Sequence, residues 1–565
     1  MMAITTYEFI YLLPLLILGS AIVILIFFLL FNRISTQQTA MLAIFCLLLS
    51  LVSSTCIGYK IISGSDNDAL ILTNLAQNVD EVTDKPTEVT DDINDAATNE
   101  QMLPEMHTVE LPPSMLNDGA SIEDDIVRNK NVILTLFTID GYGALYTSLI
   151  LFLSIIVSTL AATWFKNEAT HHDLFYLMVL FSALGATTLI YSSHLISFFI
   201  GMELLSIMIV GLVGYQYTQK YSLEAAIKYM VLSVISTSFL LMGIAFYYAA
   251  TGELTFSGLS YQLSTLSSPS ILLLLGVCLM LVGIGFKLSY VPFQLWLPDV
   301  YQGAPTCVCL LLNTIGKIAI FCAVARLFLL APIVNNETIR IIMTIMAFCS
   351  IIWGNVFSIT QHKIKRLLAY SSIAHLGYLL IALIAVQYQV LALETIGVYL
   401  IGYMLANICV LGVISLESCS NAKEDHDNDV DLYGLFWRRP IIALAMGIGL
   451  LSLAGLPLTV GFIGRFSLIL LGVTAELWLL VGTVVIVSAF SLYFYLRLVI
   501  ILFIKPDNMI KTNLTNTNIS IFAKFKQIGI NEVFIVGSAL FIVFCGVYPK
   551  WLFNLVSIAQ YLTPQ

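Results

Sequence analysis

The stretch Gly283-Ile-Gly-Phe-Lys287-Leu-Ser-Tyr-Val-Pro292 decides the fold, because it places helix breakers and a cation inside a long apolar run. That run covers about 270–291, which is long enough to cross a bilayer as a helix. Glycine and proline both disfavour a continuous helix, so the pattern predicts a transmembrane helix that unwinds at membrane depth. Unwound backbone is tolerated there only where it is buried in protein or lines a wet cavity. The stretch therefore predicts a membrane protein with an internal polar pathway.

A second stretch, Leu453-Ala-Gly455-Leu-Pro457-Leu-Thr-Val-Gly461-Phe-Ile-Gly464-Arg465, again combines helix breakers with a cation. The two broken runs lie five candidate spans apart. An odd offset reverses the direction of a helix, so the two are expected to belong to inverted repeats, a plan used by many secondary transporters. Proline kinks that serve packing alone are the alternative interpretation, which is weaker for two runs in matching places than for one.

Apolar runs of about 20 residues fill most of the chain. Of its 565 residues, 59% are hydrophobic and 11% are charged, whereas about 25% are charged in soluble domains. This excludes a soluble or peripheral protein, and the lack of alternating polarity excludes an outer-membrane barrel. We predict an all-α polytopic membrane protein of about fourteen helices with broken seventh and twelfth helices. The spans are expected at about 10–30, 41–62, 137–164, 174–191, 195–213, 225–250, 270–291, 305–330, 339–359, 367–386, 394–416, 441–471, 477–503 and 531–555.

Charge is distributed unevenly along the chain. Most Lys and Arg residues fall in the odd-numbered links between spans, so these links are expected to be cytoplasmic and both termini external. Residues 66–125 contain 16 acidic side chains and one lysine, a net charge of −15 that leaves the remainder at +5 out of a total of −10. The segment 66–130 is therefore predicted to be an external loop, and its composition suggests little fixed structure.

The cysteines give no sign of a redox or metal site. All ten lie in or beside apolar runs without a CxxC pair or a Cys/His cluster, so neither an iron–sulfur nor a zinc site is expected. Cys307-Val-Cys309 is interpreted as two small packing residues. The glycines of Gly283-Ile-Gly285 lie inside an apolar helix rather than after a strand, which argues against a nucleotide site. No cofactor is expected in this chain.

Charged side chains within apolar spans are functional candidates, because each costs about 2.5–3.5 kcal/mol at the centre of a bilayer. Glu203 lies in mid-span, although it could simply bond a neighbouring hydroxyl. Lys228 lies one helix later, and two structural interpretations compete for it. Glu224 stands four residues before it and could form an i,i+4 pair, or Lys228 could extend to the cytoplasmic surface.

Three further candidates lie deeper in their spans. Lys287 lies in the first broken span, Lys317 lies too deep in its span to reach either surface, and His375 is surrounded in sequence by hydroxyl-bearing residues. For His375, a packing role and a relay role are equally open. Desolvation favours the neutral form of a buried lysine, so a series of such lysines can exchange protons near neutral pH. A nearby carboxylate would hold the proton on the lysine, and its withdrawal would release it. Arg326 and Arg497 lie nearer span ends and are interpreted as anchors.

Four stretches resemble one protein family. Asp299-Val-Tyr-Gln-Gly-Ala-Pro305, which ends the first broken region, is similar to subunit N of bacterial proton-pumping NADH:quinone oxidoreductase, respiratory complex I, a member of the antiporter-like subunits. The same likeness extends over Phe286–Pro305, Ser197–Ser206, Lys365–Tyr378 and Leu451–Gly464. It is strong over roughly 137–505, and the motif at Asp299 favours subunit N over the related Mrp-type cation/proton antiporters.

The resemblance implies a division of the chain and a set of site residues. Two inverted five-helix repeats would occupy 174–330 and 331–505. The other parts would be helices 1–2 in 1–65, the inserted loop 66–130, helix 3 in 131–173, and a cytoplasmic link with helix 14 in 506–565. Glu203 and Lys228 match the family's Glu–Lys pair, Lys287 the lysine of the first broken helix, and Lys317 the central relay lysine.

One site residue departs from the family. The second broken helix usually supplies a lysine, but this chain has Arg465. A guanidinium stays charged at any accessible pH, so Arg465 cannot be a titrating exit residue. We interpret it as a fixed cation that repels the proton on the preceding relay near His375. The alternative is a structural pair with a carboxylate such as Glu394.

The expected function is that of a proton-translocating subunit in the membrane arm, which couples electron transfer from NADH to quinone to proton pumping. FMN, iron–sulfur clusters, NADH and quinone would be bound by other subunits. The expected partners are neighbouring membrane subunits, the peripheral arm indirectly, and the lipid bilayer, without nucleic acid, in a bacterial inner membrane. Two alternatives are a subunit of an Mrp-type antiporter and a structural membrane subunit whose charges only hold helices together.

Overall fold

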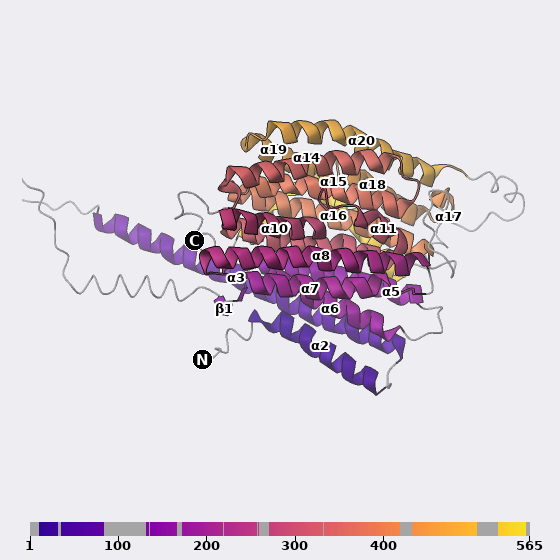
Figure 1. Cartoon of the computed structure of the whole chain (residues 1–565), viewed down its shortest axis with the longest axis horizontal. Coiled ribbons are helices and arrows are strands. Elements are labelled where there is room, and N and C mark those ends of the chain that lie inside the picture. Colours follow the sequence, from indigo (N-terminus) through magenta and orange to yellow (C-terminus); the bar gives the residue numbers. More distant parts are fainter. Residues whose placement is uncertain are drawn as a thin grey trace, which may run out of the picture.

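The computed structural model describes residues 11–31, 35–83, 132–134, 136–165, 172–217, 220–256, 258, 271–331, 333–418, 432–505 and 529–560. Over these residues the chain is almost entirely helical, and its helices lie side by side as a bundle (Figure 1). This confirms the predicted all-α fold of a polytopic membrane protein.

Twelve helices in the described part of the chain are long and apolar enough to cross a membrane. They are α2 (Leu13–Leu30), α3 (Thr36–Thr83), α5 (Gly141–Trp164), α6 (Asp173–Ile190), α7 (Leu195–Val213), α8 (Lys220–Thr251), the continuous α12 (Thr306–Leu311), η2 (Leu312–Gly316) and α13 (Lys317–Leu330), α14 (Glu337–Ile359), α15 (Ile364–Ile384), α16 (Gln389–Ser418), α20 (Trp478–Phe503) and α23 (Ile530–Val547). Each coincides with one of the predicted spans.

The remaining two predicted spans are the broken ones. The seventh forms α10 (Ile271–Lys287), an irregular turn, and then the short helix α11 (Trp296–Gly303). The twelfth forms α18 (Pro440–Ala454) and α19 (Val460–Thr474). Backbone φ is positive at Ser289 in the first break and at Gly455 and Leu458 in the second. Both predicted interruptions are confirmed, while the division into inverted repeats stays a prediction.

Two details differ from the predicted boundaries. The third span begins at Gly141 instead of residue 137, because Phe137–Thr138 forms strand β2 beside β1 (Val132–Leu134) and Asp140 then caps α5. The acidic segment was expected to have little fixed structure from residue 66 onward. Its first part instead continues α3 as far as Thr83. Residues 84–131 lie outside the described part of the chain.

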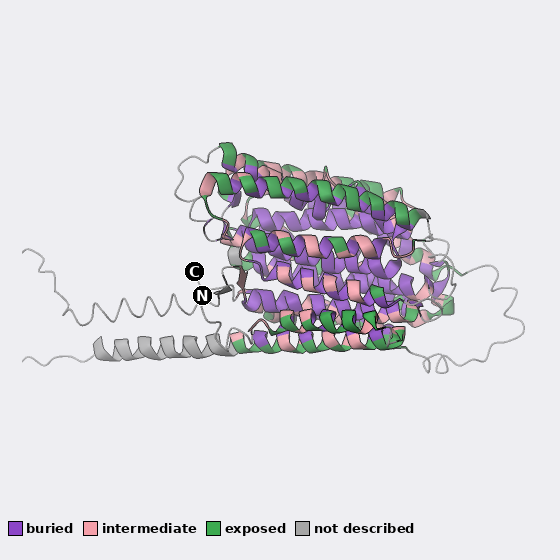
Figure 2. Cartoon of the chain, turned by 60° about the horizontal axis from the view of Figure 1, so that its bottom comes forward, coloured by how far each residue is buried: buried purple, intermediate pink, exposed green. Residues whose placement is uncertain are grey.

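Burial increases toward the middle of the bundle (Figure 2). The apolar windows of Thr306–Leu330 and α16 are wholly buried, and that of α15 is 94% buried. By contrast, α2, α8 and α20 each turn an apolar face outward. Uniformly apolar helices suit a lipid environment, where the outer surface need not be polar. The central helices are therefore the ones whose polar side chains meet other protein groups. The remaining short elements are η3 (Ile333–Asn335), α17 (Leu435–Arg438), α24 (Pro549–Val556) and η7 (Ser557–Gln560).

Candidate proton pathway

Lys287 is the last residue of α10, at the point where the first broken helix unwinds. Its side chain is 4% exposed, and Nζ donates hydrogen bonds of 2.6 Å to Ser206 Oγ on α7 and of 2.6 Å to Ser233 Oγ on α8. Two hydroxyls therefore hold the amine. An ammonium and a neutral amine both have N–H groups that can donate to these oxygens, so the site suits both protonation states.

Glu203 lies on α7, three residues before the Ser206 whose hydroxyl bonds Lys287, and so on the same face of that helix. Its Oε1 atom is buried and has no hydrogen-bond partner among the described residues. An unpaired buried carboxylate oxygen is costly, and such groups often mark a functional site. The structure therefore brings Glu203 near Lys287, as the sequence analysis expected of a carboxylate that controls a lysine.

Lys228 does not meet Glu203. Its Nζ lies 2.8 Å from Glu224 Oε1, one turn earlier on α8, and 3.0 Å from Asp299 Oδ2 on α11. The side chain is 44% exposed. The Glu203–Lys228 pair implied by the family resemblance is thus not formed, because two other carboxylates occupy the ammonium. The i,i+4 pair with Glu224 matches the structural alternative.

Lys317 lies at the centre of the bundle, as the first residue of α13 after the π-helical turn η2. It is 3% exposed, and Nζ donates a hydrogen bond of 2.5 Å to Ser372 Oγ on α15. Nζ also lies 5.5 Å from the ring centre of Tyr301, within the range of a cation–π interaction. The groups that contact this amine are neutral: a hydroxyl and a phenol ring.

An amide and phenol network lies beside this lysine. Asn313, within the π-turn, accepts hydrogen bonds at Oδ1 from the hydroxyls of Tyr301 (2.7 Å) and Tyr403 (2.6 Å). Its Nδ2 donates to Asn407 Oδ1 on α16 at 2.6 Å. Sequence analysis missed these residues, because uncharged polar side chains in an apolar run carry no signal by themselves. The network fixes the π-turn and so the position of Lys317.

His375 lies one turn beyond Ser372 on α15 and is 5% exposed. Nδ1 is 2.7 Å from the hydroxyl of Tyr399, and Nε2 is 3.3 Å from that of Tyr495. The Tyr495 hydroxyl also bonds Ser371. Each phenol can act as donor or acceptor, so either tautomer of the imidazole can be satisfied. The hydroxyls come from α16 and α20 and not, as expected, from the neighbouring residues of α15.

Arg465 lies on α19 just beyond the second break and is 6% exposed. Its guanidinium donates to the carbonyl oxygens of Ala454, at 2.7 Å, and of Leu453, and to Ser491 Oγ at 3.1 Å. Those carbonyls end α18, where a helix has no internal donors left. Glu394 is not its partner, since Glu394 Oε1 accepts from Gln560 Nε2 at 2.8 Å. Arg465 therefore caps a helix.

Two cavities meet at Arg465. A small one of about 10 Å³ is lined by His375, Tyr399, Tyr403 and Arg465, and it has about the volume that one water molecule needs. A larger one of about 330 Å³ lies against Phe462, Phe466 and Ser488, and Arg465 lines it as well. Arg465 thus lines both the cavity beside His375 and the larger one.

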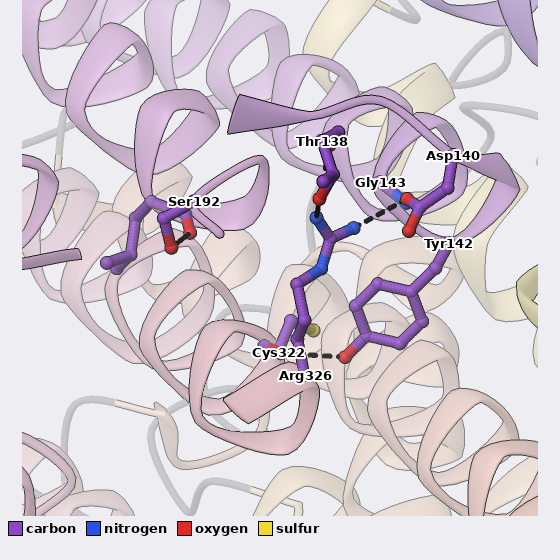
Figure 3. A network of polar contacts seen from close by, with 8 residues as sticks. Thr138, Asp140, Tyr142, Gly143, Ser192, Cys322 and Arg326 are labelled. Atoms are coloured by element: carbon purple, nitrogen blue, oxygen red, sulfur yellow. Dashed lines mark hydrogen bonds and ion pairs between the residues drawn. The ribbon is translucent and has the colours of Figure 1, made fainter. Parts of the chain in front are cut away.

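A buried ion pair joins α13 to the start of α5 (Figure 3). Arg326 is fully buried, and its Nη2 lies 2.5 Å from Asp140 Oδ1 while Nη1 donates to Thr138 Oγ1 at 2.7 Å. Tyr142 donates to the carbonyl oxygen of Cys322 at 2.8 Å and places its ring 5.3 Å from the guanidinium. The interpretation of Arg326 as a surface anchor is wrong, because Asp140 gives it a buried counter-charge.

The six predicted residues therefore form separate groups. Glu203 and Lys287 lie together, as do His375 and Arg465, with Lys317 bonded to the helix that carries His375. Lys228 stands apart with Asp299. Among the residues that the structure describes, no three His, Cys, Asp or Glu side chains gather as a metal site would require.

The chain is similar in sequence and fold to known membrane proteins. The sequence profile of the transmembrane NADH:quinone oxidoreductase/Mrp antiporter family matches residues 192–491. A chain of respiratory complex I from Thermus thermophilus, solved with bound aureothin, is 26% identical with a TM-score of 0.68, over 96% of this chain and 98% of that one.

Two other structures share the fold. A chain of the membrane-bound sulfane sulfur reductase, an archaeal respiratory membrane complex, is 20% identical with a TM-score of 0.72, over 96% of each chain. A chain of the Mrp complex from Dietzia sp. DQ12-45-1b is 17% identical with a TM-score of 0.61, over 74% of this chain and 83% of that one. Since the family profile covers more than half of its length, the protein belongs to the NADH:quinone oxidoreductase/Mrp antiporter transmembrane family.

Proposed function

We propose that this chain is a proton-translocating subunit, of the subunit N type, in the membrane arm of a proton-pumping NADH:quinone oxidoreductase. The observation that carries the proposal is the contact between Lys317 and Ser372. It joins a fully enclosed lysine to the helix of His375, and both amine and imidazole have hydroxyl partners that serve either protonation state. Such a series of titratable groups suits proton transfer better than it suits helix packing.

The proton would pass from the Glu203–Lys287 region to Lys317 and then to His375. Arg465 would act at the end of this series. Its permanent charge disfavours a proton on His375 and so promotes release once Lys317 has passed the proton on. The neighbouring one-water cavity provides the place where that proton could leave the imidazole. Lys228 would act where protons enter this series, because its ammonium can shift between the carboxylates of Glu224 and Asp299.

The likeness to a chain of respiratory complex I over nearly the full length of both chains supports the oxidoreductase assignment. Other subunits would then bind FMN, iron–sulfur clusters, NADH and quinone, and this chain would contact neighbouring membrane subunits and the bilayer. A bacterial inner membrane with both termini on the periplasmic side fits the distribution of positive charge.

A subunit of an Mrp-type cation/proton antiporter is the second candidate, favoured by the shared family profile and the Mrp fold likeness. Mass spectrometry of the native complex in detergent separates the two. Flavin and iron–sulfur subunits should co-purify if the chain belongs to an NADH:quinone oxidoreductase. Their absence, together with Na⁺/H⁺ exchange in vesicles, would refute the assignment.

The conduction role is tested by Lys317→Met, which keeps an apolar side chain of similar length. NADH-driven proton uptake by inverted vesicles should fall at least about tenfold, since a relay group has been removed. Lys550→Met, which changes an exposed lysine on α24, should leave uptake unchanged. Normal uptake in the Lys317 variant, with normal assembly, would favour a structural subunit.

A further inference from the structure

Asp299 binds two cations that come from different parts of the bundle. Its Oδ2 lies 3.0 Å from Lys228 Nζ on α8, and its Oδ1 lies 3.1 Å from Arg366 Nη1 on α15. The same Arg366 nitrogen donates to Gln302 Oε1 at 2.9 Å. One carboxylate therefore neutralises parts of two positive charges that have no direct contact with each other.

The short helix that carries Asp299 is held between those two helices. On the α8 side, a Cβ added to Gly303 would overlap the carbonyl oxygen of Tyr221, so the backbones of α11 and α8 touch there. On the α15 side, Lys365 Nζ donates to the carbonyl oxygen of Ala304, at the end of α11, at 3.0 Å. A cation at the C-terminal end of a helix is favourable. α11 thus packs between α8 and α15 and contacts both helices.

The place of α11 in the chain connects these contacts to the buried lysines. α11 follows the break after Lys287 and leads directly into α12 and the π-turn before Lys317. Arg366, for its part, lies six residues before Ser372, on the same helix as His375. The charges around Asp299 therefore touch α8, whose Ser233 bonds Lys287, and α15, which carries Ser372 and His375.

We propose that Asp299 is a positioning residue that transmits the state of Lys228 to α15. Lys228 and Arg366 share the Asp299 carboxylate. When Lys228 moves away from it, the carboxylate attracts Arg366 more strongly, and when Lys228 binds it tightly, the attraction on Arg366 is weaker. The pairs are partly exposed (37% for Asp299), and exposed pairs contribute little to stability. Their coupling therefore suits adjustment of helix position better than it suits permanent attachment. This inference rests on the proposed proton-translocating function.

The test is a double-mutant cycle of Lys228→Met and Arg366→Met, measured as the proton-uptake rate per assembled complex in inverted vesicles. With Asp299 present, the rate of the double variant should differ from the product of the two single effects by about two- to fivefold, the range of one exposed ion pair. In an Asp299→Asn background the product rule should hold, because the shared group has been removed. Asp299→Glu keeps the carboxylate and should retain part of the interaction.

Glu224→Gln is the matched control. Glu224 contacts Lys228 as Asp299 does, but it has no contact with Arg366. The interaction between Lys228 and Arg366 should therefore persist in the Glu224→Gln background. Persistence in Asp299→Asn, or equal loss in both backgrounds, would overturn the proposal.

The same variants are measured for thermal unfolding of the purified complex. A coupling that appears in the melting temperature but not in proton uptake would show a purely structural role and would also overturn it. Failure of the proposed function gives a different result, namely normal proton uptake in Lys317→Met.

Discussion

Lys317 and Ser372 connect two helices of the core, α13 and α15, through one hydrogen bond of 2.5 Å from Nζ to Oγ. The contact is buried on both sides and includes no carboxylate. A carboxylate would bind the ammonium strongly and resist its deprotonation. A neutral amine, by contrast, keeps N–H groups that can still donate to the Ser372 oxygen, whose own hydrogen is donated to the Ala369 carbonyl. This choice of partner makes the lysine able to change its charge without losing its contact.

Ser372→Ala should therefore impair proton uptake while the complex still assembles. A hydrogen bond to a charged group contributes about 1.5–3 kcal/mol, so a rate decrease of roughly tenfold or more is expected. The measurement is NADH-driven quenching of a pH-sensitive dye in inverted vesicles. Ser358→Ala on α14 is the control, because its buried hydroxyl bonds the Gly354 carbonyl of its own helix. Equal rates in the two variants would contradict a role for Ser372.

The pair Ser206 and Ser233 should be partly redundant. Each accepts a hydrogen bond of 2.6 Å from Lys287, so one hydroxyl remains in either single alanine variant. The double variant leaves the buried amine without those partners, and its proton uptake should fall by more than the product of the single effects. Ser238→Ala, at an exposed position on α8, serves as the control. Strictly multiplicative effects would show that the two hydroxyls act independently of Lys287.

Replacement of Arg465, even by lysine, should lower the melting temperature of the complex. Arg465→Met leaves the Leu453 and Ala454 carbonyls unpaired, at a cost of about 1–3 kcal/mol for each group. Arg465→Lys keeps the charge, but a single ammonium cannot reproduce the planar fork. We expect the melting temperature to order as Arg, then Lys, then Met. Proton uptake in the Lys variant then separates the two roles: retention supports a fixed charge, and loss equal to that of Met supports helix capping alone.

Removal of both charges of the Asp140–Arg326 pair should destabilise the protein less than removal of the Arg326 charge alone. Arg326→Met leaves a buried carboxylate without its counter-charge, which typically costs about 3–5 kcal/mol. The double variant Asp140→Asn with Arg326→Met removes both charges and should recover a large part of that loss. Native gel electrophoresis of solubilised membranes measures the assembled fraction. A double variant that is worse than Arg326→Met would exclude the pair as the cause.

Deletion of residues 70–125 should preserve assembly and proton uptake. The deletion ends α3 shortly beyond its apolar part and leaves 126–131 to lead back to β1. A deletion confined to 84–125 keeps the extension of α3 and leaves the same short return, so it should assemble less well. Pull-down of the full-length and deleted chains compares their partners. Loss of a partner with the longer deletion would show that the acidic segment is an interaction element.

The transmembrane spans and their two breaks could be predicted from the sequence, because both depend on local residue pattern. Runs of apolar residues predicted the spans, and Gly283–Pro292 and Leu453–Arg465 predicted the two breaks that the structure has. Lys317 was correctly predicted to be buried, because its distance along the helix from either surface can be counted in the sequence.

Partners could not be predicted in the same way. Asp299 is 71 residues from Lys228, and Asp140 is 186 residues from Arg326, so each pair depends on which helices become neighbours. Hydropathy does not encode that order. The carbonyl partners of Arg465 had no sequence signal either, because every residue carries a carbonyl and only the break leaves two of them accessible.

The π-turn at Leu312–Gly316 has a consequence for how the chain can move. A π-turn holds one more residue than the α-helical turn it replaces, so its conversion would rotate all that follows by about 100°. Lys317 and Arg326 both follow it on the same helix, with no further interruption between them. Their contacts, with Ser372 in the core and with Asp140 near the start of α5, would then be lost or kept together. The conformation of this one turn therefore sets the rotation of α13, and with it both contacts.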